Sequence, residues 1–207
     1  MQITSNYLLT NSNNLFRKFM LPFFIAVSAL TLQSCGYNDM VEKDEAVSQK
    51  WADVQTQYQR RADLIPNLVS TVKGFAEQEK EVLTQVVEAR AKATSMNLNV
   101  DDLTPENLQK FQAAQGNLRG ALGRLMVVVE KYPDLKSNQN FLELQAQLEG
   151  TENRISVARQ KFNTAVQTYN SSIRKFPRVM YAGSFGFEKR AYFEAEESAQ
   201  DAPKVEF

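Results

Sequence analysis

Apolar residues recur at alternating steps of four and three positions over most of this 207-residue chain. The steps average about 3.5 residues, the period of a helix that packs on other helices. The pattern runs from residue 47 to 93 and returns at 108–132 and 141–176, with no comparable strand-type alternation between residues 40 and 176. It predicts an all-α fold, an up-and-down antiparallel four-helix bundle over residues 36–176 that follows an N-terminal signal or anchor segment. The expected core residues include Trp51, Phe75, Leu122 and Phe162.

The lengths of the three periodic stretches require the first of them to break. As one straight helix, residues 40–96 would be about 85 Å long, whereas the second and third stretches measure about 40 Å and about 60 Å. We therefore expect a break near residues 74–78, giving helices of roughly 36, 18, 27 and 40 residues. Pro66 is the competing break point, but it matches the lengths less well and is predicted to be a kink. The pattern Asp39-x-x-Glu42 predicts a capping box where the first helix begins.

The N-terminal segment, residues 1–35, has the order of a secretory signal. Arg17 and Lys18 precede an apolar run at 19–32, and a small residue stands before Cys35. The run has 14 residues, whereas a membrane-spanning helix needs about 20. The ending Leu-x-Ser-Cys resembles a lipobox, so Cys35 is predicted to carry the lipid that holds the protein at the membrane. The alternative is a small apolar Cys35 within an uncleaved anchor helix.

The inventory of side chains excludes much enzyme chemistry. The chain has no histidine and one cysteine, so nucleophile pairs with histidine, His-containing zinc sites and cysteine clusters cannot form within it. Lys plus Arg and Asp plus Glu balance at 24 each, which argues against a nucleic-acid partner bound through bulk positive charge. Cleavage before Cys35 would leave 22 basic and 24 acidic side chains, since Arg17 and Lys18 are lost, so the anchor is expected to supply the membrane affinity. We predict no catalytic residue, cofactor or metal site.

The densest polar cluster on the expected first helix consists of Arg60, Arg61, Asp63 and Asn67. Arg61 falls on the apolar face, where a partly buried arginine needs a polar partner on a neighbouring helix. The helix lengths place Gln115 at a similar height, so we expect these two residues to meet. A structural role that fixes the register of the helices is favoured over a ligand site.

The helical period ends at Pro177, and residues 177–207 form an aromatic, glycine-punctuated segment followed by a polar tail. This segment either caps the bundle or offers a docking surface, and capping is favoured because exposed aromatic patches are uncommon on monomers. Because the first and last helices are expected to be antiparallel, the segment should lie at the membrane-proximal end. The aromatic residues expected there, which are also the candidates for partner binding, are Phe185, Phe187, Tyr192 and Phe193.

Several motifs resemble those of the LemA family, over nearly all of residues 36–207. The most specific is the stretch Tyr58-Gln-Arg-Arg-x-Asp-Leu-Ile-Pro-Asn-Leu-Val69; others are Val87-x-Ala-Arg-Ala91, Tyr132-Pro-x-Leu-Lys136, Leu148-x-Gly-x-Glu-Asn-Arg-Ile155, Tyr169-Asn170 and Gly186-Phe187. The resemblance implies a bacterial envelope protein with an N-terminal membrane anchor and a four-helix bundle. It attaches no catalytic residues to these motifs. Many members keep a transmembrane helix at the N-terminus, and the cysteine-terminated signal departs from that pattern.

Two functions follow from these features. The leading hypothesis is a non-enzymatic, membrane-anchored protein of the bacterial cell envelope, with its bundle on the extracytoplasmic side and another envelope protein as partner. The alternative is a small-ligand binder or an enzyme that uses carboxylates and arginines inside the bundle. A cavity between helices lined by two or more acids would favour the alternative, and a filled apolar core would favour the leading hypothesis.

Overall fold

The computed structural model describes the backbone of residues 4–194 and the side chains of Met20 and of residues 36–194. Within this range the chain is helical and has no strand, which confirms the predicted all-α class. The long helices are α1 (Thr4–Lys73), α2 (Lys80–Ser95), α3 (Pro105–Val129) and α5 (Gln139–Arg174). The short ones are η1 (Val100–Asp102), α4 (Pro133–Lys136), η2 (Arg178–Met180) and η3 (Gly183–Phe185).

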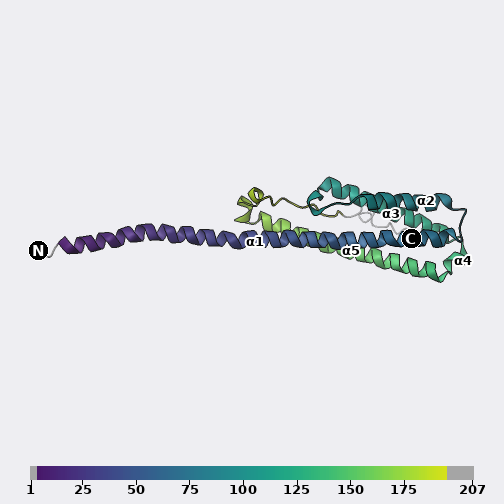
Figure 1. The fold of residues 1–207 in the computed structure, drawn as a ribbon, viewed down its shortest axis with the longest axis horizontal. Helices are drawn as coiled ribbons and strands as arrows, with labels where there is room; N and C mark the ends of the chain where they lie inside the picture. The colour runs from purple at the N-terminus through teal and green to yellow at the C-terminus, as the bar shows by residue number, and fades with distance from the viewer. Residues whose placement is uncertain (1–3, 195–207) are drawn as a thin grey trace, which may run out of the picture.

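The long helices lie side by side, and α1 and α5 form the longest pair (Figure 1). These two run in opposite directions, because Ser172 near the end of α5 bonds Asp39, whereas Glu152 nearer its start bonds Arg61. The helices α2 and α3 pack on each other, alongside the part of α1 that is remote from the N-terminus. With 16, 25 and 36 residues, α2, α3 and α5 are close to the predicted lengths.

The first periodic stretch breaks where its length predicts. The helix α1 ends at Lys73, and the carbonyl of Val72 accepts hydrogen bonds from the N–H groups of both Phe75 and Ala76 in a tight turn. Phe75, which was expected in the core, is 43% exposed, and Ala76 is buried instead. That expectation is wrong because the helical spacing does not continue through the turn.

Pro66 does not break α1, although it has no N–H to donate to the carbonyl of Ala62 four residues earlier. The guanidinium of Arg90 in α2 supplies the missing donor, with Nε 2.8 Å from that carbonyl oxygen. A side chain from the neighbouring helix therefore satisfies the backbone acceptor that proline leaves open.

The helix α1 does not begin near residue 40, as the expected capping box required. It continues without interruption from Thr4, so Asp39 lies within the helix and its carboxylate bonds Lys43, Ser172 and Arg178. A short polar pattern can serve a contact between helices as well as a helix start, and here it does the former. Among the residues the structure describes, no helix holds an apolar stretch of the length and hydropathy that a membrane crossing requires. The side chain of Cys35 lies outside the described side chains.

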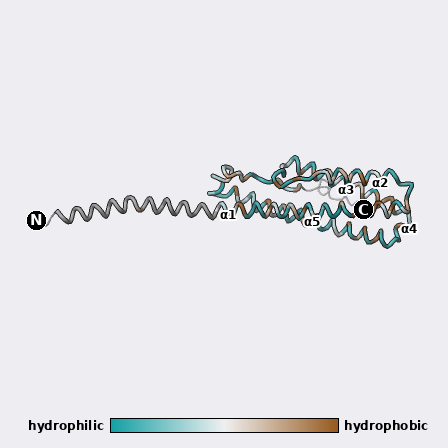
Figure 2. Tube along the Cα trace, in the orientation of Figure 1, coloured by the Kyte–Doolittle hydropathy of each residue, from teal (hydrophilic) through white to brown (hydrophobic). Residues whose placement is uncertain are grey.

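The core consists of two apolar clusters stacked along the bundle. One surrounds Trp51 and Phe162, and the other includes Leu122; all three side chains are buried, as predicted. Figure 2 shows apolar and polar residues interspersed along the helices of the bundle, as expected of helices with one buried face. A layer of polar side chains lies between the two clusters.

Replacing Phe162 with alanine should lower the free energy of unfolding by about 3 to 5 kcal/mol, because this fully buried ring leaves a cavity. Chemical denaturation followed by circular dichroism measures the change. The matched control is Glu81→Ala on an exposed face of α2, which should change the free energy by no more than about 0.5 kcal/mol. Equal denaturation midpoints for the two variants would contradict the assignment of the core.

Candidate functional site

Arg61 is the buried centre of a hydrogen-bond network that joins the four long helices. From α1, its Nη1 donates to Glu152 Oε2 of α5 at 2.8 Å. Its Nη2 donates to Oε1 of Gln115 in α3 at 2.7 Å and to the carbonyl oxygen of the same residue at 3.2 Å. The amide of Gln115 in turn donates to the carbonyl of Ala93 in α2 at 3.2 Å. The predicted contact between Arg61 and Gln115 is therefore confirmed.

This Arg61 network forms the polar layer between the two apolar clusters. The guanidinium of Arg61 is 3% exposed and lies 5.2 Å from the centre of the Tyr58 ring, in cation–π contact. Burial raises the pKa of the Tyr58 hydroxyl, and the positive charges of Arg159 and Arg61 offset part of that effect. A buried guanidinium is costly to leave unpaired, so the helices are held where its partners can reach it.

The other members of the predicted polar cluster are not part of the hydrogen-bond network around Arg61. Arg60, Asp63 and Asn67 are exposed on a different face of α1. Asp63 accepts from Gln59 at 2.7 Å. Neighbouring residues on a helix point about 100° apart, so a cluster that is dense in sequence is divided between two faces.

An open groove of about 690 Å³ lies beside the Arg61 network. Its lining includes the basic residues Arg61, Arg119 and Arg159 and the acidic residues Glu152 and Glu194. Arg119 Nη1 lies 3.8 Å from Glu152 Oε1, so Glu152 is shared by two arginines. This arrangement suits a structural ion pair and offers an anion a surface rich in guanidinium groups. Within the described residues, no group of three or more Asp, Glu, His or Cys side chains could hold a metal ion.

Phe193 is buried in the apolar cluster around Trp51 and Phe162 rather than at the end of the bundle. Its ring stacks on Trp51 with the centroids 6.0 Å apart and meets Phe162 edge-on at 5.4 Å. Asn163 bonds the backbone of Phe193 twice, accepting from its N–H at 2.9 Å and donating to its carbonyl at 3.0 Å. Arg159 covers the outer face of the ring at 4.8 Å. The placement of Phe193 at the membrane-proximal end was wrong, because residues 186–194, here called the C-terminal segment, turn back along the bundle.

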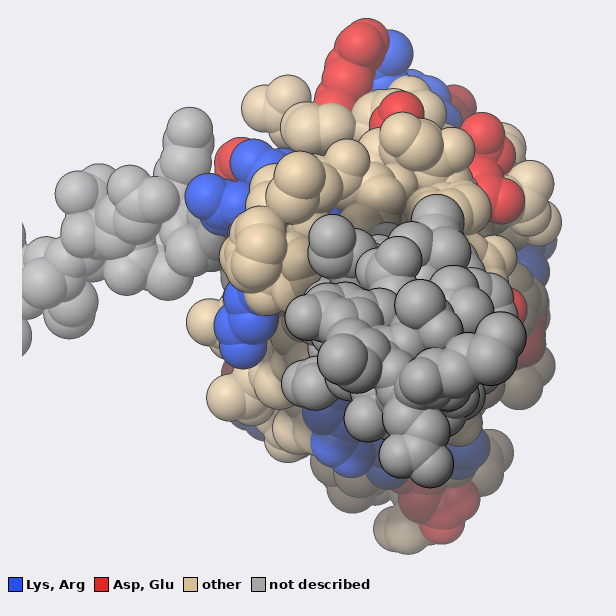
Figure 3. Space-filling view, turned by 90° about the vertical axis from the view of Figure 1, so that its left-hand side faces the viewer, with Lys and Arg blue, Asp and Glu red and all other residues tan. Residues whose placement is uncertain are grey.

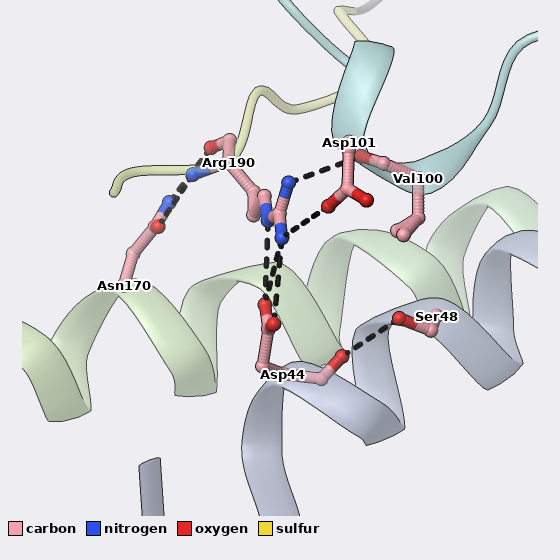
Figure 4. Close-up of polar contacts among 6 residues, drawn as sticks. All are labelled: Asp44, Ser48, Val100, Asp101, Asn170 and Arg190. Carbon is pink, nitrogen blue, oxygen red and sulfur yellow. Dashed lines mark hydrogen bonds and ion pairs between the residues drawn. The ribbon is translucent and has the colours of Figure 1, made fainter. Parts of the chain in front are cut away.

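Arg190 fixes the C-terminal segment to three other parts of the chain (Figure 4). Its guanidinium bonds the carboxylate of Asp44 in α1 at 3.2 Å and reaches the carbonyl of Val100 and the carboxylate of Asp101 in η1. Its backbone N–H and carbonyl are both bonded by the side chain of Asn170 in α5. Burial lowers the pKa of Arg190, but the carboxylates of Asp44 and Asp101 outweigh that effect and raise it.

Four aromatic rings form a collar where α1 enters the bundle. Tyr37 of α1 meets Phe185 and Phe187 edge-on, with ring centroids 5.3 Å and 5.6 Å apart, and Phe185 also meets Tyr181 at 6.0 Å. The hydroxyl of Tyr181 lies so close to Gly36 that a Cβ there would be 2.5 Å from it. The collar therefore places Phe185 and Phe187 at the expected end of the bundle, here called the proximal end. Tyr192 is exposed and stands between Arg190 and Phe193 in the C-terminal segment, so it does not join the collar, contrary to its predicted place at the proximal end.

Asp39 links α1, α5 and η2 at the proximal end, next to the collar. Its carboxylate bonds Lys43 on its own helix, Ser172 at the end of α5 and Arg178 in η2. The hydrogen bond from Lys43 lowers the pKa of Asp39, burial opposes this, and Ser172 and Arg178 lower it further. This contact confirms that the start of the bundle and the end of α5 lie together.

Replacing Arg61 with methionine removes the three hydrogen bonds of its guanidinium and should destabilise the fold by at least about 1.5 to 3 kcal/mol, the usual value for one hydrogen bond to a charged group. Urea denaturation measures the loss. Arg60→Met, at the adjacent exposed position, is the control and should cost no more than about 0.5 kcal/mol. Similar losses for both variants would show that the Arg61 network does not hold the helices.

Acid should weaken the contacts of Asp39. Because the pKa of Asp39 is lower in the folded state than in the unfolded chain, its ionised form stabilises the fold above about pH 4, and this contribution is lost as the pH falls through the folded-state value. Asp39→Asn should therefore be less stable than wild type at pH 7, with the difference shrinking toward pH 3. Thermal denaturation across this range measures it, and a constant difference at every pH would contradict the prediction.

Comparison with known proteins agrees with the motifs of the sequence. A model of the LemA family matches residues 50–207. Magnetosome protein MamQ 2 of Paramagnetospirillum magneticum is 29% identical over 186 residues, covering 82% of this chain and 68% of the relative. Magnetosome protein MamQ of Magnetospirillum gryphiswaldense is 28% identical over 196 residues, covering 86% and 72%. Protein LemA of Metamycoplasma hominis is 24% identical over 180 residues, covering 86% and 78%. Since the family model spans well over half of its length, this chain belongs to the LemA family.

Proposed function

We propose that this protein is a membrane-anchored component of the bacterial cell envelope, in which an up-and-down antiparallel four-helix bundle on the extracytoplasmic side acts non-enzymatically through a protein partner. The observation that carries the proposal is that the bundle begins directly after the N-terminal segment, since Gly36 and Tyr37 already pack in the collar, so that either mode of anchoring holds the bundle next to the membrane. The same helix that supplies Trp51 and Arg61 to the bundle extends back to Thr4, through the segment with the basic and apolar order of a secretory signal. Membership of the LemA family supports an anchored envelope protein, since the motifs of that family imply one.

The filled interior of the bundle supports a structural rather than a chemical role. Two apolar clusters occupy the space between the helices, and Arg61 between them is engaged by Gln115 and Glu152. A protein of this kind presents its surface to a partner while its core holds the helices in register. The partner of this chain is expected in the same compartment as the bundle, within reach of the anchor.

The groove beside the Arg61 network supports a second candidate, a small-ligand binder or an enzyme that uses its arginines and carboxylates. The two candidates predict different outcomes when a small anion is added and when the protein is crosslinked in cells. A small anion that raises the melting temperature of wild type, but not of Arg119→Gln, would favour the second. Crosslinking in intact cells that captures one envelope protein with both wild type and Arg119→Gln would favour the first candidate.

The anchor itself is tested at Cys35. Cells that express the full-length chain are grown with a clickable fatty acid, and labelling of the purified protein is compared with that of Cys35→Ala. Wild type should be labelled and the variant should not, because the thiol is the predicted acylation site and the chain has no second cysteine. Ser34→Ala keeps a small residue before the cysteine and serves as the control that should remain labelled. Equal labelling of wild type and Cys35→Ala would remove lipidation from the proposal.

A further inference from the structure

Large apolar side chains lie exposed at the proximal end. Phe176, just after α5, is 81% exposed, and in the two short helices that follow Met180 is 74% and Phe185 is 59% exposed. Val179 and Tyr37 at the same end are also more than 40% exposed. Exposed apolar groups gathered in this way mark a surface that contacts another apolar phase or a partner. We call these residues the proximal patch.

The segment that carries most of the proximal patch is basic. Residues 174–185 include Arg174, Lys175 and Arg178 and no acidic residue. Arg178 is paired with Asp39, while Arg174 and Lys175 are exposed at the end of α5. Figure 3 views the molecule from this end: between the grey atoms an uncharged surface is visible, with Lys and Arg mainly at its left and lower edges and Asp and Glu mainly at its top and right. Residues 174–185 thus carry positive charge, whereas the neighbouring part of α1 carries acidic residues such as Asp39 and Glu42.

The depth of the proximal patch matches that of a headgroup layer. The apolar run of the N-terminal segment ends at residue 32, and Tyr37 follows five residues later in the same helix, about 7.5 Å along its axis. A bilayer of about 40 to 45 Å with a hydrocarbon core of about 30 Å leaves about 5 to 7.5 Å for each headgroup layer. If Cys35 instead carries acyl chains, Tyr37 lies only two residues from them. Both modes of anchoring place the collar at the depth where aromatic side chains concentrate in membrane proteins.

We propose that the proximal patch docks on the lipid surface, with Phe176, Met180 and Phe185 in the headgroup and upper acyl region and Arg174 and Lys175 against anionic headgroups. This inference rests on the proposed membrane anchor and adds to it, since acyl chains on Cys35 alone would leave the bundle free to tilt. The contacts of Asp39 with Ser172 and Arg178 fix the patch to the bundle. Docking therefore sets the orientation of the whole bundle on the membrane.

The test uses fluorescence quenching by brominated lipids. Full-length Met180→Trp is reconstituted into phosphatidylcholine and phosphatidylglycerol vesicles, with or without bromine on the acyl chains. The control is Val127→Trp, because Val127 is 68% exposed on α3, far from the proximal end, and Trp51 is buried and common to both proteins. Brominated lipid should reduce the emission of Met180→Trp and leave that of Val127→Trp at the wild-type level. Equal emission losses in the two variants would overturn the proposal.

Two further measurements separate the outcomes. Phe176→Trp repeats the test at a second exposed position, so that a folding defect of one variant does not decide the result. Flotation of wild type with the vesicles tests the anchor alone: a chain that does not float refutes the proposed anchoring, whereas a chain that floats without quenching at positions 176 and 180 refutes only the docking. A photo-crosslinker at position 180 that forms an adduct with a protein or with a second copy of the chain, instead of lipid, would also overturn lipid docking.

Discussion

The charge of Arg61 is the constraint on which the arrangement of the helices depends. A guanidinium that is 3% exposed requires hydrogen-bond acceptors at fixed positions, and it finds them in Gln115 and Glu152. Apolar side chains alone specify the register less strictly, because cores tolerate repacking with other apolar groups of similar volume. With the Arg61 network between them, such a slide would bury an unpaired charge. The network thus gives the bundle one register.

Pro66 shows how the network and the backbone of α1 are connected. The network lies about one helical turn from this proline, at the level where the helix lacks one of its own hydrogen bonds. Arg90 bonds the carbonyl of Ala62 from α2, so the neighbouring helix repairs the backbone of α1. Two arginines on different helices, Arg61 and Arg90, therefore tie α1 to its neighbours within two turns. This explains how a long helix passes through a proline and still reaches the turn after Lys73.

Apart from the start of α1, the apolar period was sufficient to predict the long helices, the break after Lys73, the burial of Trp51 and Phe162, and the contact of Arg61 with Gln115. These features depend on spacing along single helices and on length matching, which a sequence states directly. The positions of Arg190 and Phe193 could not be predicted in this way. They lie in a segment without helical period, and their partners, Asp44 and Trp51, are more than 140 residues distant in the chain. Glu152 was missed for a related reason, because it stands next to the apolar stripe of α5 and not on it.

Phe193 completes the apolar cluster around Trp51 only at a late stage of synthesis. Trp51 is synthesised early, and the ring that stacks on it arrives only with the last tenth of the chain. During synthesis, the face of Trp51 that Phe193 covers has no such partner until nearly the whole chain has been made, because contacts between distant parts of a chain form late. A chain truncated before Phe193 would leave that face without its stacked ring. A segment without helical period, rather than any of the long helices, thus completes the packing around the indole.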